Sequence, residues 1–280
     1  MKKITRRSFL AAAGLTAAAL ALTACGGSSS STASSTASSA AASSEAASSS
    51  AAAELTTVEA GKLTMATNAT FPPYEMTTDT GAFEGIDVDT AQAIAEKLGL
   101  ELQIDDMEFD AALLSVQQGK ADIVMAGVTV TDERKAVMDF SDSYATGIQS
   151  IIIPEGSDIA TPDDLAGKKI GTQRGTTGYL YCTDDFGEEN VIAYDDGLTA
   201  VQALNNGQVD AVVIDNAPAQ EFVAANPGLK ILDTAYAQED YAIGVAKGNT
   251  QLLDAINGAL EELQDDGSLQ AIVDKYITAE

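Results

Sequence analysis

Gln117-Gln118-Gly119-Lys120-Ala121-Asp122-Ile123-Val124 recurs later in the chain as Asn205-Asn206-Gly207-Gln208-Val209-Asp210-Ala211-Val212. Before each copy, apolar residues recur at helical spacing over 110–118 and 197–206. Each helix pattern ends on a glycine, the residue that most readily adopts the left-handed conformation after a helix. An apolar segment follows. Each copy therefore predicts a helix, a tight turn and a buried strand of a parallel sheet covered on both faces.

The same alternation of helix and strand patterns continues around the repeat. Further helices are expected at 87–98, in a short segment from Thr161-Pro162-Asp163-Asp164 to Gly167, and in two parts of 250–276 divided at Asp266-Gly267. Strands are expected at 63–66, 101–104, 121–128, 169–172, 191–194, 209–214, 229–232 and 241–246. This alternation predicts an α/β fold, and the repeat predicts two similar α/β lobes rather than one long sheet.

The first residues of the chain have the pattern of an export signal. Basic residues at Lys2, Lys3, Arg6 and Arg7 precede an apolar run over 9–22 that is too short to span a bilayer as a mature helix. Thr5-Arg6-Arg7-Ser8-Phe9-Leu10 resembles a twin-arginine export motif, and both that route and the general secretory route stay open.

Leu22-Thr23-Ala24-Cys25 resembles the lipobox of bacterial lipoproteins, in which the cysteine is acylated and becomes the first mature residue. We therefore expect 1–24 to be a signal peptide and Cys25 to be lipidated. The alternative is an uncleaved anchor in which Cys25 is an ordinary small residue. Residues 26–53 are almost entirely Ser, Ala and Thr, so 25–60 is expected to be a lipid-anchored, disordered tether. The protein is then extracytoplasmic, anchored to the cell membrane at the cell surface or in the periplasm.

Composition excludes several classes of function. The net charge of −27 disfavours binding to nucleic acid or to anionic polymers. The chain has no histidine and two cysteines, and if Cys25 is lipidated no intrachain disulfide can form. His/Cys zinc sites and histidine-activated nucleophiles are excluded too, and the paired acids lack the spacing of a calcium loop. We expect no metal and no cofactor, and we expect Cys182 to be a buried small apolar residue.

Polar residues follow the predicted strands at their carboxyl ends, where open α/β sheets bind ligands. Arg134 offers a fork suited to a carboxylate, Gly127, Thr129 and the turn at Thr176-Thr177 offer N–H and hydroxyl donors, and Asp215 offers a carboxylate for an ammonium group. The aromatic residues Phe71, Tyr74 and Phe109 are expected to form apolar walls. These groups complement a zwitterion. The alternatives are that Arg134 lies on a solvated helix face, that Asp215 caps a helix and that the phenylalanines belong to the core.

Residues 61–280 resemble the bacterial family 3 solute-binding proteins, the amino-acid receptors of ABC importers. The resemblance rests on several short motifs together: Phe71-Pro72-Pro73-Tyr74-Glu75, Gly85-Ile86-Asp87-Val88-Asp89, Thr131-Asp132-Glu133-Arg134, Gly175-Thr176-Thr177-Gly178 and Tyr241-Ala242-Ile243-Gly244-Val245. It implies a bilobal periplasmic-binding-protein type II fold, with two α/β lobes joined by two hinge strands. Lobe 1 is expected at 61–147 plus 243–280 and lobe 2 at 148–242.

The resemblance also implies the role of each site residue. The α-carboxylate of an amino acid is expected at Arg134, Thr129, Gly127 and Thr177, and the α-ammonium group at Asp215. The side chain is expected between Phe71 and Phe109, with its tip at Asn68 and Gln173. Because relatives that take cationic side chains often have a carboxylate where this chain has Asn68, the amide favours a neutral polar ligand such as glutamine, while arginine stays possible.

The implied function is capture of a polar or basic L-amino acid for an ABC permease, by a monomer that is not an enzyme. One alternative is an enzyme on the same scaffold, similar to cyclohexadienyl dehydratases, for which Glu75 is the obvious candidate acid. Another is an amino-acid sensor lipoprotein.

Overall fold

The computed structural model of the protein describes residues 55–277. These residues belong to one compact unit. The predicted signal peptide, Cys25 and most of the predicted tether lie outside the described residues. Within 55–277, no helix is both long enough and apolar enough to cross a membrane.

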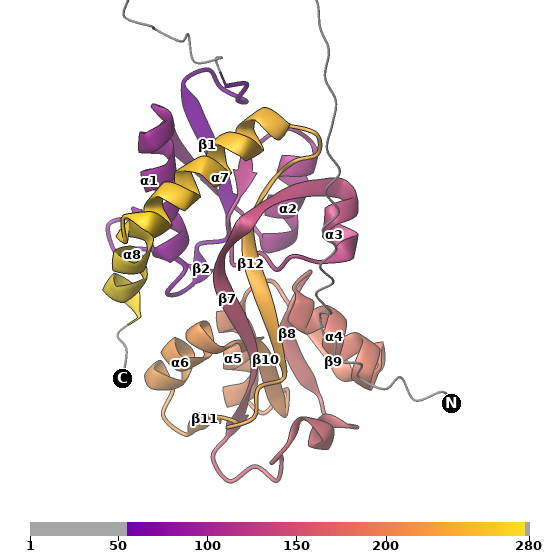
Figure 1. The fold of residues 1–280 in the computed structure, drawn as a ribbon. Helices are drawn as coiled ribbons and strands as arrows, with labels where there is room; N and C mark the ends of the chain where they lie inside the picture. Colours follow the sequence, from indigo (N-terminus) through magenta and orange to yellow (C-terminus); the bar gives the residue numbers. More distant parts are fainter. Residues whose placement is uncertain (1–54, 278–280) are drawn as a thin grey trace, which may run out of the picture. The chain divides into compact units, whose positions relative to one another are not determined.

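Nine of the described strands form one hydrogen-bonded sheet in the order β5-β1-β6-β12-β7-β10-β8-β9, with β11 paired to β7 (Figure 1). Its strands are β1 (Lys62–Thr67), β5 (Glu101–Asp106), β6 (Ile123–Val124), β7 (Met138–Pro154), β8 (Ile170–Gln173), β9 (Val191–Tyr194), β10 (Ala211–Asp215), β11 (Leu229–Ile231) and β12 (Ala237–Ala246).

This sheet consists of two parallel groups joined by an antiparallel pair. Strand β1 is parallel to β5 and β6, and β8 is parallel to β9 and β10. Between the groups, β7 and β12 pair antiparallel with each other. On its other side, β7 pairs antiparallel with β10, and β12 pairs antiparallel with β6. The parallel groups agree with the sequence prediction. Hydrogen bonds continue from one group to the other through β12 and β7, so the two connecting strands link both parallel groups in one curled sheet.

Helices cover both parallel groups. They are α1 (Ile86–Leu98), α2 (Phe109–Gln117), α3 (Asp132–Val137), α4 (Thr177–Phe186), α5 (Gly197–Asn205), α6 (Asn216–Ala225), α7 (Thr250–Asp265) and α8 (Ser268–Tyr276), with 3-10 turns η1 (Pro162–Leu165) and η2 (Glu188–Asn190). A small sheet of β2 (Thr70–Phe71), β3 (Glu75–Thr77) and β4 (Phe83–Glu84) lies beside them. In both copies of the repeat the glycine after the helix has positive φ, 65° at Gly119 and 67° at Gly207, as predicted.

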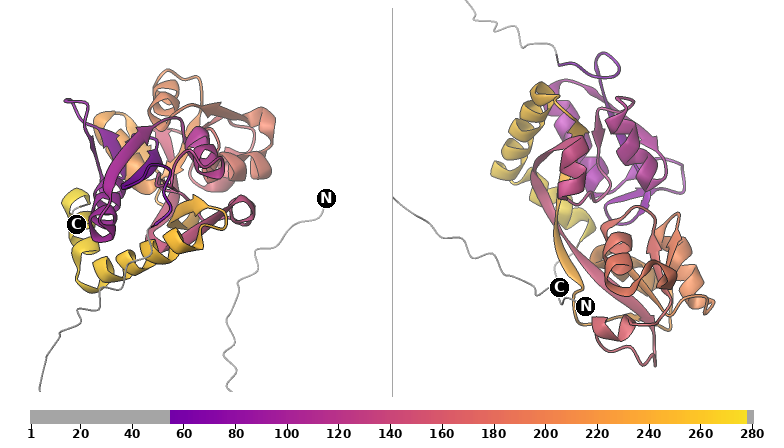
Figure 2. Two further views of the ribbon diagram at one scale, coloured as in Figure 1. Left: turned by 90° about the horizontal axis from the view of Figure 1, so that it is seen from above. Right: turned by 90° about the vertical axis from the view of Figure 1, so that its right-hand side faces the viewer.

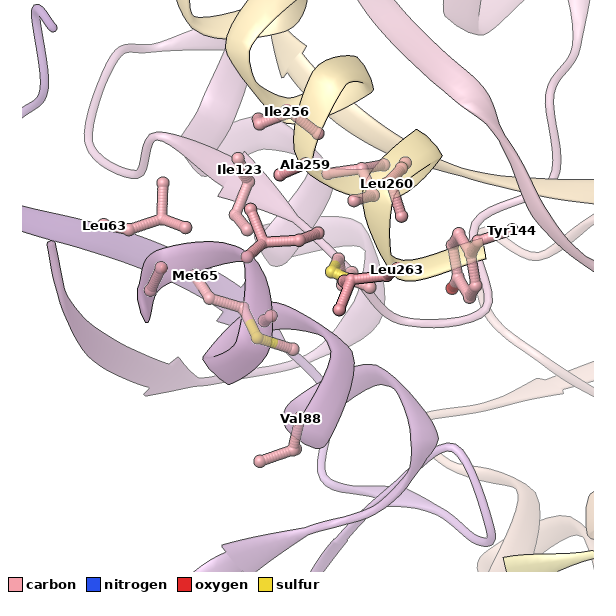
Figure 3. Close-up of a cluster of buried hydrophobic side chains, with 14 of the residues drawn as sticks. Leu63, Met65, Val88, Ile123, Tyr144, Ile256, Ala259, Leu260 and Leu263 are labelled. Carbon is pink, nitrogen blue, oxygen red and sulfur yellow. The ribbon is translucent and has the colours of Figure 1, made fainter. Parts of the chain in front are cut away.

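Alternate residues along the parallel strands enter different hydrophobic clusters. Met65 and Ile123 pack with α1 and α7 in one cluster (Figure 3), whereas Ala66 and Val124 pack with α2 in another. The second parallel group repeats this arrangement with two further clusters, one of which contains Cys182 as a fully buried thiol. Both groups are therefore covered on both faces, which explains why their strands are almost continuously apolar.

Strands β7 and β12 connect the two groups. Figure 1 and the right view of Figure 2 show both strands running from the group that contains β1 to the group that contains β10. β7 is 17 residues long, and the sequence pattern did not predict it. Strand β7 passes through both groups of parallel strands, so its two ends pack in different cores and its middle section is more exposed. No single hydrophobic period therefore describes the whole strand. The predicted lobe boundaries fall within β7 and β12 and stay predictions.

Strand β6 is shorter than the predicted strand at 121–128. After Val124 the chain turns at Gly127, which has a φ of 53°, and Thr129 then forms an isolated bridge with Tyr241. This turn directs residues 126–134 toward the carboxyl ends of the parallel strands.

Candidate ligand-binding site

One pocket lies at the carboxyl ends of β1, β6, β8 and β10, the edge at which open α/β sheets bind ligands. All the predicted site residues except Tyr74 line it. The full lining is Asn68, Phe71, Glu75, Phe109, Ala126, Gly127, Thr129, Arg134, Gln149, Gln173, Thr176, Thr177, Val213, Ile214, Asp215 and Tyr241. The fold thus brings the predicted residues together. Their contacts with a ligand stay predictions.

Arg134 is a buried side chain of α3, 8% exposed, and does not lie on a solvated helix face. Its Nη1 donates to the Thr129 carbonyl at 2.8 Å and its Nη2 to the Gly175 carbonyl at 3.2 Å. The guanidinium carbon also lies 5.3 Å from the centre of the Phe109 ring. Burial lowers the pKa of Arg134, and Glu239 partly offsets this. The guanidinium group has five N–H donors, so donors remain for an anion.

Thr129 and Thr177 present their backbone N–H groups rather than their hydroxyl groups. Both hydroxyls are within donor distance of Glu239 Oε2, at 3.1 Å and 3.0 Å, and Gln149 Nε2 donates to the same oxygen at 3.0 Å. Within residues 55–277, no backbone acceptor pairs with the N–H of Thr129 or of Thr177. Thr177 is also the first residue of α4, where the helix dipole favours an anion.

Gly127 lines the pocket but does not offer the predicted donor. Its N–H donates to Asp87 Oδ2 at 2.9 Å, on the buried side of the turn. An alanine Cβ here would lie 2.9 Å from the Phe71 ring, so the position needs glycine for space as well as for its positive φ. Its predicted role in carboxylate binding is therefore replaced by a role in shaping the wall.

Asp215 both lines the pocket and caps a helix, so its two predicted readings are compatible. Oδ1 accepts from Ala217 N at 3.1 Å at the start of α6, and Oδ2 accepts from Ile148 N at 2.7 Å. Burial raises the pKa of Asp215 to about 6, although these hydrogen bonds and the nearby Tyr241 hydroxyl favour the charged form. A cation in the pocket would lower that pKa again.

Phe71 and Phe109 form aromatic walls, whereas Tyr74 lies behind one of them. Tyr74 is 4% exposed, stacks on Phe71 with ring centres 5.7 Å apart, and meets the edge of Tyr241 at 5.5 Å. It supports Phe71 and does not line the pocket, because the turn after β2 directs its ring into the core. The prediction of Tyr74 as a wall residue is corrected accordingly.

Asn68 and Gln173 meet at one end of the pocket. Gln173 Nε2 donates to Asn68 Oδ1 at 2.7 Å and to the Asp195 carbonyl at 3.3 Å, and Asn68 Nδ2 donates to the Met107 carbonyl at 2.9 Å. Gln173 Oε1 is left as an acceptor directed by this network. A second hollow of about 450 Å³ shares Phe109 with the pocket and is lined by Glu108, Asp110, Arg174 and Asp195.

The arrangement of cation, helix N-terminus, carboxylate and aromatic walls occurs in a chain whose residues 63–279 match the family model "Bacterial extracellular solute-binding proteins, family 3". The chain belongs to this family.

Similar members of family 3 include the L-cystine-binding protein TcyJ of Escherichia coli strain K12, which is 35% identical over 79% of this chain and 85% of its own length. Among solved structures, an ancestral arginine-binding protein bound to glutamine is 42% identical with a TM-score of 0.75, covering 79% of this chain and all of that one. The arginine-, lysine-, histidine-binding protein ArtJ of Geobacillus stearothermophilus is 33% identical with a TM-score of 0.75, covering 78% and 96%. These neighbours have the bilobal α/β fold of family 3.

Four polar residues at or behind this family 3 site were missed as ligand-site candidates: Glu75, Gln149, Glu239 and Tyr241. Gln149 interrupts the apolar run of 147–153, and this interruption was a usable signal. Glu75 was considered as a possible acid and as a source of negative potential for a cationic ligand, and its complete burial was not foreseen. Glu239 precedes a strand that the sequence pattern began at 241, so it was not assigned to any element.

Proposed function

We propose that this chain captures an L-amino acid with a polar or basic side chain outside the cytoplasm and delivers it to an ABC permease. The observation that carries the proposal is that Arg134 and Asp215, one cation and one anion, line the same pocket with aromatic walls. A free amino acid carries the complementary pair of charges on its α-carbon. The names of the similar proteins, which include binding proteins for cystine, arginine, histidine and glutamine, support the same class of ligand.

In this proposal the α-carboxylate binds the Arg134 fork and the N–H groups of Thr129 and Thr177. The α-ammonium group binds the Asp215 carboxylate. Thr177 and Asp215 belong to the group of strands around β10, and Arg134 and Thr129 follow β6 in the other group. A ligand that contacts both groups stabilises the closed state and shifts the population toward it.

The tip of the pocket limits the choice of side chain. The direct partners there are the paired amides of Asn68 and Gln173, which suit a neutral polar group such as the amide of glutamine. Glu108, Asp110 and Asp195 lie in the adjoining hollow, and their charge would attract a cationic tip despite Arg174. Desolvation and the surrounding carboxylates raise the pKa of Glu108, which indicates a negative potential there. Glutamine and arginine are therefore the two leading ligands.

We also propose that the protein is a lipid-anchored monomer. The support is the sequence around Cys25, which lies outside the described residues. Cys25→Ser should abolish incorporation of labelled fatty acid and release the protein from the membrane fraction. Retention of the label in Cys25→Ser would refute the anchor, and a dimeric mass by light scattering would refute the monomer.

Binding without turnover is part of the proposal. The enzyme alternative requires an acid that reaches a substrate, and Glu75 is a buried acid that lines the pocket. Release of phenylpyruvate from prephenate would establish the enzyme. A sensor would bind the same ligand, so deletion of the protein should be tested for loss of amino-acid uptake.

A thermal-shift screen of the protein against the twenty amino acids, cystine, ornithine and prephenate tests the ligand class. A ligand at 100 times its Kd stabilises by about 2.7 kcal/mol. This corresponds to a shift of several degrees for a protein of this size. A response confined to prephenate, or no response to any amino acid, would refute the proposal.

A further inference from the structure

Beside the pocket, three buried side chains, those of Glu75, Asp87 and Tyr144, have polar atoms without a hydrogen-bond partner in the described part of the chain. Among the described residues, neither oxygen of Glu75, nor Asp87 Oδ1, nor the Tyr144 hydroxyl has one. These side chains come from β3, α1 and β7, and both carboxyl groups are fully buried. Of the three, Glu75 also lines the ligand pocket. A buried, unpaired carboxyl group on a ligand pocket is costly and needs a physical explanation.

Glu75 and Asp87 are neighbours, because Asp87 N donates to the carbonyl of Tyr74, the residue before Glu75, at 2.9 Å, and their two carboxyl groups act on each other. Two carboxylates cannot both be ionised at this separation in a buried site, so the pair shares one proton. Asp87 is the better carboxylate, since its Oδ2 accepts the Gly127 N–H at 2.9 Å. Burial and the charge of Asp87 raise the pKa of Glu75 well above its usual range, whereas burial raises the pKa of Asp87 to about 6. Glu75 is therefore the member of the pair that holds the shared proton more readily.

The groups that act on the pair are acidic or phenolic. They are Asp106 at the end of β5, Tyr144 on β7, Tyr74 after β2, and, through Tyr74, Asp215 on β10, with Tyr241 of β12 against Tyr74. Among the described residues that line the pocket, Arg134 is the only basic side chain, and it belongs to the anion-binding end. Among the described residues that line the pocket, no basic side chain other than Arg134 is thus available to pair with Glu75 or Asp215.

We propose that Glu75 and Asp87 form a second acidic anchor for the cationic group of the ligand, and that ligand binding expels their shared proton. This inference rests on the proposed function, because it requires a ligand with an ammonium group. The O–H bond of Glu75 breaks, the electron pair stays on Glu75, and the proton passes to solvent or buffer. The ammonium group keeps its protons. After the proton has left, the ammonium group faces Asp215 and both ionised carboxylates of the Glu75–Asp87 pair, whereas before it faced Asp215 and only one. Its positive charge offsets the repulsion between Glu75 and Asp87.

Glu75→Gln is a close mimic of the protonated state, because its amide N–H can donate to Asp87 as the carboxylic acid does. The variant should therefore fold, and it should bind more weakly than the unchanged protein because one anionic contact is lost, with no proton to release. Glu101→Gln is the matched control, since Glu101 is an exposed glutamate at the start of β5 and is not a lining residue of the pocket.

The experiment is calorimetry at pH 7.5 in two buffers with different heats of ionisation, with L-glutamine, L-arginine and L-cystine as probes. Asp215, with a pKa of about 6, is already ionised at this pH, so it contributes little. We expect release of at least about 0.3 proton per ligand from the unchanged protein and from Glu101→Gln, and below about 0.1 from Glu75→Gln. By linkage, the Kd of the unchanged protein should fall as pH rises from 7 to 8.5, and that of Glu75→Gln should stay flat.

Binding with no proton release in the unchanged protein would overturn the inference while leaving the proposed function intact. Equal release in Glu75→Gln would overturn it too, since the proton would then come from another group. Absence of binding by every probe and every amino acid of the screen would overturn the proposed function, and this inference with it.

Discussion

Removal of the Arg134 guanidinium group tests the anion end of the pocket. Arg134 is 8% exposed, and two of its N–H groups donate to the carbonyls of Thr129 and Gly175, at 2.8 Å and 3.2 Å. In Arg134→Ala, a ligand carboxylate would enter a buried site without the guanidinium group that pairs with it. Truncating one partner of a buried charge pair costs about 3–5 kcal/mol. At about 1.4 kcal/mol per tenfold change, the Kd should rise about 140- to 3,700-fold.

The graded and control variants separate charge from geometry. Arg134→Lys keeps the charge but loses the fork, so we expect a rise in Kd of about 10- to 100-fold. Arg174→Ala is the matched control, because the Arg174 side chain is 53% exposed and reaches Asp195 only at 3.5 Å. With a neutral ligand its Kd should change less than about threefold.

Calorimetry with the amino acid identified by the screen measures these values. Loss of Arg134 also leaves two carbonyls without a donor, at about 1–3 kcal/mol for a buried one, so the empty variant must first be shown to be folded by its melting curve. A folded Arg134→Ala that binds within tenfold of the unchanged protein would refute the reasoning. Arg134 would then hold its loop together rather than bind the ligand.

Asp215→Asn should weaken binding at least about 100-fold while lowering the melting temperature of the empty protein by only a few degrees, because an asparagine oxygen can still cap α6; retained binding would make Asp215 a cap alone. Burial raises the pKa of Asp215 to about 6, so the Kd should rise about tenfold per pH unit below 6, where the ligand must displace a proton. In the empty protein, the contribution of Asp215 to the free energy of unfolding should instead increase as the pH falls from 6 toward 4. A flat Kd between pH 5 and 7 would contradict this. Gly147→Ala should destabilise the protein by about 1–3 kcal/mol in chemical denaturation, because the new Cβ would overlap the Tyr241 ring, whereas Gly258→Ala, with nothing within 4 Å, should be neutral or stabilising. Cys182 is fully buried, and burial raises the pKa of its thiol to about 12, so it should react with maleimide only after unfolding; rapid labelling of the native protein would contradict its burial.

The structure gathers the predicted site residues where strand ends carry the information, and it differs from the prediction where side-chain or N–H direction decides; the ligand contacts stay predictions. Gln173 and Asp215 are the last residues of buried strands, and Arg134 lies in the short helix that follows β6, so their convergence at one edge follows from the topology of a parallel sheet. Tyr74 and Gly127 also occur at such ends, but one ring turns into the core and one N–H turns toward Asp87. The direction of the backbone over two or three residues decided where the Tyr74 ring and the Gly127 N–H point. Residue composition contains no information about that direction.

The local sequence alone determined the elements of this protein that depend on near neighbours. Helix periodicity, the caps, and the glycines at 119 and 207 specified the repeat and both parallel groups, because these preferences act over a few residues. The tertiary structure alone decided the pairing of β7 with β12 and the meeting of Thr129 with Glu239, which are 110 positions apart. It likewise placed Glu75 against Asp87 at the pocket. Contacts between distant residues depend on how the whole chain closes on itself, and no local pattern encodes that distance.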